Sequence, residues 1–470
     1  MHRKTIGNRS SRRAAMILPP TSGEAVDLIT TFEVDPASAR VHEHGWQSWT
    51  PTTTYRLDEA PHRCAHELFR VLHCRAEAPD PGPAFQGDGL LAVDDGHGRV
   101  HVLAAPDGRR EVPTIRADVD GERVTIRADA EVEHLVDDAG GGIDAALARW
   151  ADTTVERLGL PAVRPAPTVW CSWYHYYTEV TEADVDENLE AIGHHELDVE
   201  VVQLDDGYQA AIGDWLTLSD RFASVEDMVG RIRAAGRRAG IWLAPFLVGE
   251  RSRLAAEHPD WLIGGPEAPI SAGHNWEQDL AALDVTHPDA AAYLTRVCTE
   301  MRSWGVDYFK IDFVYAGALP GRRHGGHDPL AAYRHGLDLI RDAIGDDAYL
   351  LGCGAPLLPS LGKVDAMRVS PDTGPNHEPI VADELSLPST RSAMLTGTAR
   401  AFQHGRFWVN DPDCLIVRPA VEQREAWAEH VERVGGLRAS SDRIADLDDW
   451  GLATTRRLLA ADVPATFVTG

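Results

Sequence analysis

The sequence predicts an α/β protein whose larger part is a (β/α)8 TIM barrel, preceded by an N-terminal antiparallel β-sandwich domain. Three observations lead to this prediction. Between about residues 168 and 441, short apolar runs alternate with helix-period segments, as βα units do. Residues 22–140 instead show brief alternating segments separated by Gly, Asp and Pro turns, and the prolines at 161, 165 and 167 separate the two regions.

The clearest predicted barrel strand is 306–313, with the sequence Val-Asp-Tyr-Phe-Lys-Ile-Asp-Phe. Its apolar and aromatic residues are typical of a parallel strand buried on both faces. Lys310 and Asp312 lie at its C-terminal end, where barrels place their chemistry. Buried charges are costly unless they are paired or used, so the two residues form either a buried ion pair or part of a functional site.

Seven further runs complete the predicted barrel, and a helix at 144–158 precedes it. An open doubly wound sheet is the alternative, but no GxGxxG motif follows the first strand. We expect a sandwich with a short basic leader at 1–160, the barrel at 161–450 and a short C-terminal tail at 451–470. The seven runs are 168–173, 199–204, 239–245, 349–354, 366–369, 407–411 and 437–441.

Composition restricts the partners and the compartment. The length of 470 residues suits a large barrel with a smaller domain, and the net charge of −28 argues against nucleic acid and anionic membranes. No run reaches the ~18 apolar residues that a membrane span needs. Residues 2–15 lack the apolar stretch of a secretory signal, and the six dispersed cysteines favour reduced thiols, so we expect a cytoplasmic protein. The sequence is compatible with an oligomer.

The basic residues are mostly arginine, because Lys4, Lys310 and Lys363 are the only lysines. Together with the acidic surplus, this suggests adaptation to high salt (a halophilic protein), although a GC-rich genome would also exchange Lys for Arg. The group Cys64, His66, His73 and Cys74 has the residue types of a metal site. Its spacing matches no zinc pattern and no HExxH motif occurs, so we predict neither metal nor cofactor.

The residues at the ends of the predicted strands combine carboxylates with aromatic side chains, which is how proteins grip sugars. Two carboxylates are also the minimum for cleaving a glycosidic bond. Lys310 shares a strand face with Asp312 and would keep it ionised as a nucleophile requires, whereas Asp372 lies in a loop where a proton donor and acceptor is needed. The strand-end residues are Trp173, Tyr174, Asp205, Asp206, Trp242, Lys310, Asp312, Cys353, Arg368, Asp372 and Asp411.

Each of these residues also has an ordinary structural interpretation. Asp205-Asp206-Gly207 could be a simple turn, and Trp173 and Trp242 could be core residues. Asp411-Pro412-Asp413 is expected to serve as a turn and cap. Arg368 binds substrate or orients a carboxylate. Separate structural roles do not predict that these residues share one face of a barrel.

The same segments resemble glycoside hydrolase family 36, specifically the single-chain α-galactosidases of bacteria and archaea. The resemblance runs from about Trp170 to Asp442, and the Gly-Trp-Gln-Ser-Trp segment at 45–49 resembles the family's N-terminal sandwich. The motifs that carry it are Trp173-Tyr174, Gln203-Leu204-Asp205-Asp206-Gly207, Gly240-Ile241-Trp242, Lys310-Ile311-Asp312-Phe313, Gly352-Cys353-Gly354, and Arg368 to Thr373.

The resemblance implies a retaining α-galactosidase that acts on terminal α-galactosyl residues of melibiose- or raffinose-type oligosaccharides or aryl galactosides. Asp312 would be the nucleophile and Asp372 the acid/base, with their carboxyl groups ~5–5.5 Å apart. Asp205 and Asp206 would hold the galactose 4- and 6-hydroxyls. The remaining implied pocket residues are Lys310, Arg368 and Cys353 near the 2- and 3-hydroxyls, and Trp173, Tyr174, Trp242 and either Trp46 or Trp49 as walls.

Two features separate this sequence from the usual family pattern. Family members carry a C-terminal antiparallel β domain, which this sequence is expected to lack, and the sandwich region is short.

Three alternative functions are also compatible with the sequence. They are a hydrolase for a related α-glycoside, an α-galactosyl transferase of the raffinose-synthase kind, and a non-catalytic sugar-binding protein. The presence of both Asp312 and Asp372 disfavours the last.

Overall fold

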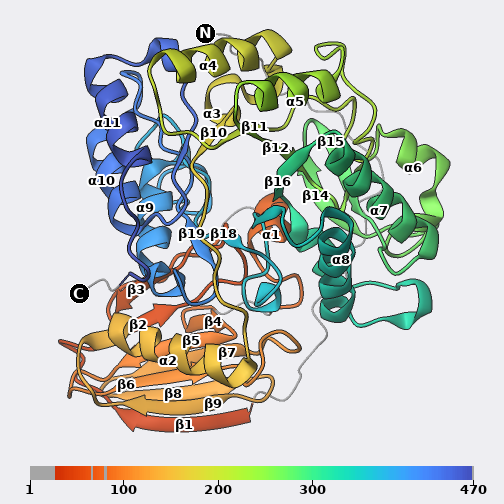
Figure 1. Cartoon of the computed structure of the whole chain (residues 1–470). Coiled ribbons are helices and arrows are strands. Elements are labelled where there is room, and N and C mark those ends of the chain that lie inside the picture. Colours follow the sequence, from red (N-terminus) through yellow and green to blue (C-terminus); the bar gives the residue numbers. More distant parts are fainter. Residues whose placement is uncertain (1–26, 65–66, 79–81, 468–470) are drawn as a thin grey trace.

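The computed structural model describes residues 27–64, 67–78 and 82–467. Within them, a β-sandwich is joined to an eight-stranded parallel barrel (Figure 1), and this confirms the predicted fold class. The predicted basic leader and His66 lie outside the described residues.

The sandwich consists of two antiparallel sheets, with strand orders β1-β8-β7-β4 and β3-β2-β5-β6-β9. Alternating residues turn inward and pack between the sheets, among them Leu91 and Leu103 from one and Ile115 and Ile126 from the other. The strands are β1 (Asp27–Glu33), β2 (Arg40–Glu43), β3 (Thr53–Arg56), β4 (Phe85–Asp88), β5 (Leu90–Asp94), β6 (Val100–Ala104), β7 (Thr114–Asp120), β8 (Arg123–Ala128) and β9 (Glu133–Asp137).

Two helices connect the sandwich to the barrel. Helix α2 (Gly142–Leu158) packs on β5 and β6, and its Trp150 meets Phe402 and Phe407 of the barrel with ring centroids 6.2 and 5.8 Å apart. Helix α1 (Glu67–His73) lies against β14 (Ser271–Asn275) on the barrel side (Figure 1). One apolar core therefore runs through both parts of the chain.

All eight predicted barrel strands are present, and neighbouring strands are parallel. Their hydrogen-bonded order is β19-β18-β17-β16-β12-β11-β10-β20. The N–H groups of Gly436 and Leu437, just before β20, each donate to the Asn410 carbonyl of β19 at 2.9 Å and so close the barrel. The strands are β10 (Val169–Cys171), β11 (Val201–Leu204), β12 (Arg238–Leu243), β16 (Val306–Ile311), β17 (Tyr349–Gly352), β18 (Ala366–Arg368), β19 (Val409–Asp411) and β20 (Ala439–Ser440).

Helices surround the strands, and most begin at a side-chain cap. Thr181 opens α4 with a capping box that pairs it with Asp184, and Asp328 caps α8 in front of a proline. Most of the first half of the predicted C-terminal tail (451–470) forms part of helix α11. The helices are α3 (Trp173–Tyr176), α4 (Glu182–His194), α5 (Val225–Ala234), α6 (Arg253–Glu257), α7 (Pro288–Ser303), α8 (Pro329–Ile344), α9 (Thr390–Ala399), α10 (Arg424–Val434) and α11 (Asp449–Leu459).

A small antiparallel sheet that the sequence did not predict follows β12. It contains β13 (Leu247–Gly249), β14 and β15 (Gln278–Ala282), in the order β13-β15-β14. Its hairpin turn places Trp276 and Glu277 in left-handed backbone conformations, with φ of +49° and +54°. Such turns usually carry Asn-Gly or Asp-Gly, so this sequence lacks the usual signal for the hairpin.

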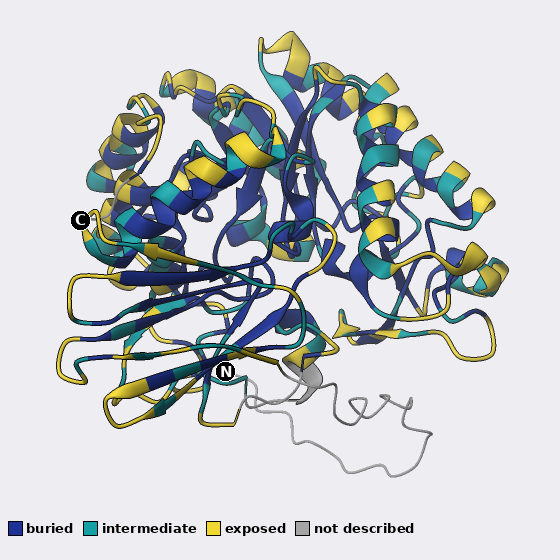
Figure 2. Cartoon of the chain, turned by 90° about the horizontal axis from the view of Figure 1, so that it is seen from below, coloured by how far each residue is buried: buried dark blue, intermediate teal, exposed yellow. Residues whose placement is uncertain are grey.

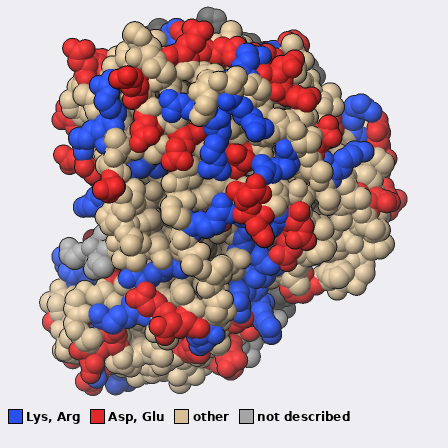
Figure 3. Space-filling model, viewed as in Figure 1, with Lys and Arg blue, Asp and Glu red and all other residues tan. Residues whose placement is uncertain are grey.

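The barrel strands are buried almost throughout, while the outer faces of the helices are exposed (Figure 2). On the face drawn in Figure 3, acidic and basic side chains are interspersed over both parts of the molecule. Within the residues that the structure describes, no helix has the length and apolarity needed to cross a bilayer.

Candidate active site

A cavity of about 280 Å³ opens where several barrel strands end. Strand register explains the convergence. Trp242 pairs with Lys310 across β12 and β16, so both side chains reach the same end of the barrel. The cavity is lined by Trp49, Trp173, Tyr174, Tyr177, Thr178, Asp205, Asp206, Trp242, Asn275, Trp276, Lys310, Asp312, Phe313 and Asp372, and nine of these are predicted site residues.

Asp312 follows β16 and is surrounded by donors. Its Oδ2 accepts the Trp242 indole N–H at 3.0 Å, and its Oδ1 accepts the backbone N–H of Phe313 at 2.8 Å. Lys310 Nζ lies 3.9 Å from Oδ2. These groups stabilise a negative carboxylate pointing into the cavity.

Lys310 is bound more directly to Asp205, with Nζ 2.9 Å from Oδ2. Burial opposes the ammonium charge, but Asp205 and Asp312 outweigh it and raise the pKa of Lys310 well above its usual value. Asp205 also accepts Gln203 Nε2 at 2.7 Å. Lys310 is therefore a permanent cation between two carboxylates.

Asp206 is held by two side-chain donors. Gln209 Nε2 donates to its Oδ1 at 2.6 Å and the Trp276 indole N–H to its Oδ2 at 2.8 Å. Burial nevertheless raises the pKa of Asp206 to about 6. Asp206 therefore loses its negative charge when the pH falls below about 6.

Asp372 lies in the loop after β18, and about a third of its side chain is exposed. Arg368 Nη1 contacts its Oδ1 at 3.1 Å. Burial and the nearby charges of Asp413 and Asp312 raise the pKa of Asp372 to about 7, against the opposing effect of Arg368. Asp372 can therefore hold a proton near neutral pH, whereas Asp312 is surrounded by N–H donors and Lys310.

The N-terminal part of the chain contributes Trp49 to the cavity. Its ring packs edge-on against Phe313, with centroids 4.8 Å apart. The buried guanidinium of Arg400 fixes the loop that carries Trp49, because it donates to the carbonyls of Gln47, Ser48 and Thr50 at 2.6–3.0 Å. The same group donates to the Val369 carbonyl after β18, so it joins the loop to the barrel.

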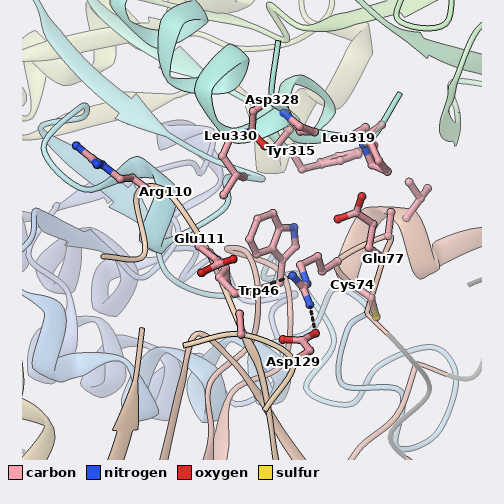
Figure 4. A pocket seen from close by; sticks show the side chains of 18 residues that line it. Trp46, Cys74, Glu77, Arg110, Glu111, Asp129, Tyr315, Leu319, Asp328 and Leu330 are labelled. Carbon is pink, nitrogen blue, oxygen red and sulfur yellow. Dashed lines mark hydrogen bonds and ion pairs between the residues drawn. The ribbon is translucent and has the colours of Figure 1, made fainter. Parts of the chain in front are cut away.

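Three predicted site residues lie outside the lining of this cavity. Trp46, close to Trp49 in the sequence, lines a second cavity of about 270 Å³ between sandwich and barrel, with Arg110, Glu111 and Leu330 (Figure 4). Cys353 is buried, and burial raises the pKa of its thiol. Arg368 is buried beneath Asp372, where its guanidinium is engaged by carboxylates.

Five lining residues were not predicted. Three of them lie close in sequence to predicted site residues: Phe313 follows Asp312, and Tyr177 and Thr178 come shortly after Tyr174. The other two, Asn275 and Trp276, come from the unexpected hairpin. Phe313 has a left-handed backbone with φ of +52°, which is uncommon for a bulky residue and often marks a functional site. No local sequence signal brings Trp276 to Asp206, because the two residues meet only through the fold.

Comparison with known proteins finds similar chains. The Melibiase family model matches residues 160–333. The α-galactosidase TtGalA of Thermus thermophilus, solved in complex with stachyose, is 31% identical over 91% of each chain, with a TM-score of 0.76. A second structure of TtGalA holds p-nitrophenyl α-D-galactopyranoside, with 30% identity, 93% of this chain and 92% of that chain covered, and a TM-score of 0.75.

A more distant relative is the α-galactosidase AgaA of Geobacillus stearothermophilus, which is 27% identical over 164 residues, covering 32% of this chain and 22% of AgaA. The matched segment therefore spans about a fifth of that relative. The identity and coverage shared with TtGalA, together with the family model over the first half of the barrel, establish the relationship. The chain belongs to the α-galactosidases of glycoside hydrolase family 36.

Proposed function

We propose that this protein is a retaining α-galactosidase that hydrolyses terminal α-D-galactosyl residues by double displacement. Asp312 attacks the anomeric carbon, while Asp372 donates its proton to the departing glycosidic oxygen. Asp372 then takes a proton from water, which attacks the galactosyl–Asp312 ester and releases galactose with its original anomeric configuration.

One observation carries the proposal: two carboxylates with opposite surroundings line a single cavity. Asp312 is met by N–H donors and a lysine, as a nucleophile requires. The pKa of Asp372 is raised to about 7, as an acid/base requires. The stachyose and p-nitrophenyl galactoside complexes of TtGalA support α-galactosides as the substrate class.

We assign galactose recognition to Asp205 and Asp206, which would accept hydrogen bonds from the 4- and 6-hydroxyls. Both carboxylates are buried, which supports this role. A sugar whose hydroxyls do not reach them would leave a buried carboxylate without a hydrogen-bond partner and would therefore bind more weakly than galactose. Lys310, which contacts Asp205 at 2.9 Å, would lie near the 2- and 3-hydroxyls, and Trp49, Trp173, Tyr174 and Trp242 would form the walls. Arg368 and Cys353 would support the site from beneath.

The direct test is release of p-nitrophenol from the α-galactoside, compared with the α-glucoside and the β-galactoside. Turnover selective for the α-galactoside, lost in Asp312→Asn, is expected. Equal turnover of the α-glucoside would overturn the proposed specificity, and full activity of the variant would overturn the role of Asp312.

We further propose a cytoplasmic, salt-adapted enzyme. The buried thiols Cys171, Cys298, Cys353 and Cys414 support a reducing compartment, and the net charge of −28 supports the salt adaptation. Assays from low to molar KCl should show activity and thermal stability rising with salt. A monotonic loss of both would contradict the salt adaptation.

A further inference from the structure

Arg368 is the centre of a buried cluster of charges beneath the cavity. Its Nη1 meets Asp372 at 3.1 Å, its Nε meets Asp411 at 3.0 Å and its Nη2 meets Asp413 at 2.7 Å. One cation is therefore shared by three carboxylates. A buried cluster with this excess of negative charge is strained unless one carboxylate holds a proton.

The hydrogen bonds show which of the three carboxylates is least surrounded by donors. Asp413 accepts from the backbone N–H groups of Thr373 and Cys414 at 2.8 and 2.7 Å, from Arg368 and from the Tyr174 hydroxyl. Each of these partners is a donor. Burial raises the pKa of Asp413, and the donors Arg368, Tyr174 and Thr373 oppose that rise by stabilising its charged form.

The side chain of Asp411 likewise meets donors, since it accepts from Arg368 Nε and from the backbone N–H of Asp413, both at 3.0 Å. Asp372 differs from both, because its single side-chain hydrogen bond in the described part of the chain is the one to Arg368, and the rest of it faces the cavity. The proton of the cluster therefore belongs on Asp372.

We propose that Asp413 is a positioning residue, held as a carboxylate by Tyr174, that keeps the proton of this cluster on Asp372. Asp413 has a left-handed backbone with φ of +86°, the conformation that directs its side chain between Tyr174 and Arg368. The Asp-Pro-Asp segment thus has a role beyond the turn expected from the sequence. This inference rests on the proposed function, in which Asp372 is the acid/base.

The electrostatics of the cluster agree with this assignment. After burial, the charge of Asp413 has the largest effect in raising the pKa of Asp372, and Arg368 opposes it. Removing the charge of Asp413 would also leave Arg368 freer to stabilise ionised Asp372. Both effects act in the same direction and lower the pKa of the acid/base. The titratable and charged groups that face Asp372 are Arg368, Asp413, Asp312, Lys310, Tyr174, Tyr177 and Cys353.

The experiment is the pH profile of kcat/KM for p-nitrophenyl α-galactoside in wild type and Asp413→Asn. The alkaline limb reports loss of the Asp372 proton in the free enzyme. We expect it to move down by about one pH unit in the variant, with activity about tenfold lower on the alkaline side. An unchanged limb would overturn the inference, because a residue with a purely structural role lowers activity equally at all pH values.

Two further variants keep the test decisive. Tyr174→Phe removes the hydroxyl that stabilises Asp413 without removing a charge, and it should move the limb in the same direction by less. Asp442→Asn removes a buried carboxylate that pairs with Arg418 instead, and its limb should match that of wild type. A limb that moves equally in Asp442→Asn would contradict a specific role of Asp413.

The outcome for the wild type separates this inference from the proposed function. No turnover of any α-galactoside by wild type would count against the function itself. A normal wild-type profile combined with an unmoved limb in both Asp413→Asn and Tyr174→Phe would count against the role of Asp413 alone.

Discussion

The indole N–H of Trp242 donates to Asp312 Oδ2 at 3.0 Å. The two residues lie at the ends of the adjacent strands β12 and β16, and the strand register sets Trp242 beside Lys310. Trp242, which the sequence analysis assigns to the wall of the sugar pocket, is therefore also a hydrogen-bond donor to the proposed nucleophile, Asp312. This contact fixes the carboxylate and compensates for its burial.

We expect Trp242→Phe to reduce kcat about 10- to 100-fold, because the variant keeps an aromatic wall but loses the N–H that orients Asp312. The matched control is Trp173→Phe, because Trp173 lines the same cavity but Trp242 is the indole that donates to Asp312, so the control should affect KM more than kcat. Steady-state kinetics of both variants provide the comparison. Equal loss of kcat in the two would indicate that the N–H has no special role.

Substrate binding should weaken in acid. The pKa of Asp206 is raised to about 6, so the residue is charged above that pH and neutral below it. A neutral carboxyl is a poorer acceptor for sugar hydroxyls, and KM should therefore rise as pH falls through about 6. Trp276→Phe removes a donor that stabilises ionised Asp206 and should shift this rise to higher pH. A KM independent of pH between 5 and 7 (roughly one unit either side of the Asp206 value) would contradict this assignment.

The alkaline side of the wild-type profile should follow Asp372. Its pKa of about 7 means that the proton required for leaving-group departure is present below neutral pH and is lost above it. We expect kcat/KM to fall about tenfold for each unit of pH above this value. Asp372→Asn should abolish the alkaline limb, and a limb that survives in this variant would belong to another group.

Arg400→Met should loosen the connection between sandwich and barrel. It leaves four carbonyls, three of them in buried contacts, without their donor, so we expect a loss of about 3 kcal/mol in the free energy of unfolding and a higher KM, because Trp49 is no longer fixed. Urea unfolding and kinetics measure the two effects.

The control for that change is Arg56→Met, whose solvent-exposed pair with Asp58 should leave the free energy of unfolding almost unchanged. A loss of stability in Arg400→Met with an unchanged KM would separate the role of Arg400 in folding from any effect on Trp49.

The sequence was sufficient for the barrel because each strand carries its own apolar run and turn signals. The convergence of Asp205, Lys310 and Asp312 followed from the rule that strand ends share one face. Trp276 could not be predicted in the same way, since its hairpin lacks the usual turn residues and its contact with Asp206 is made only in three dimensions. The choice between Trp46 and Trp49 likewise depends on how the loop is held.

The role of Arg368 was hidden for a related reason. The sequence places Asp372 four residues away from it and Asp411 at a strand end on the same face, but it does not predict that Asp411 and Asp413 both contact this guanidinium. That approach depends on the register of β18 against β19, which pairs Arg368 with Asp411. A cluster of charges contributed by different strands is therefore difficult to predict from the sequence.

The most direct test of the central claim is product analysis of azide rescue with p-nitrophenyl α-galactoside. In Asp312→Gly, azide should enter from the side of the missing nucleophile and give β-galactosyl azide. In Asp372→Gly, azide should attack the galactosyl–Asp312 intermediate and give α-galactosyl azide. These two products together would establish both roles, whereas α-galactosyl azide from Asp312→Gly would contradict the assignment of the nucleophile.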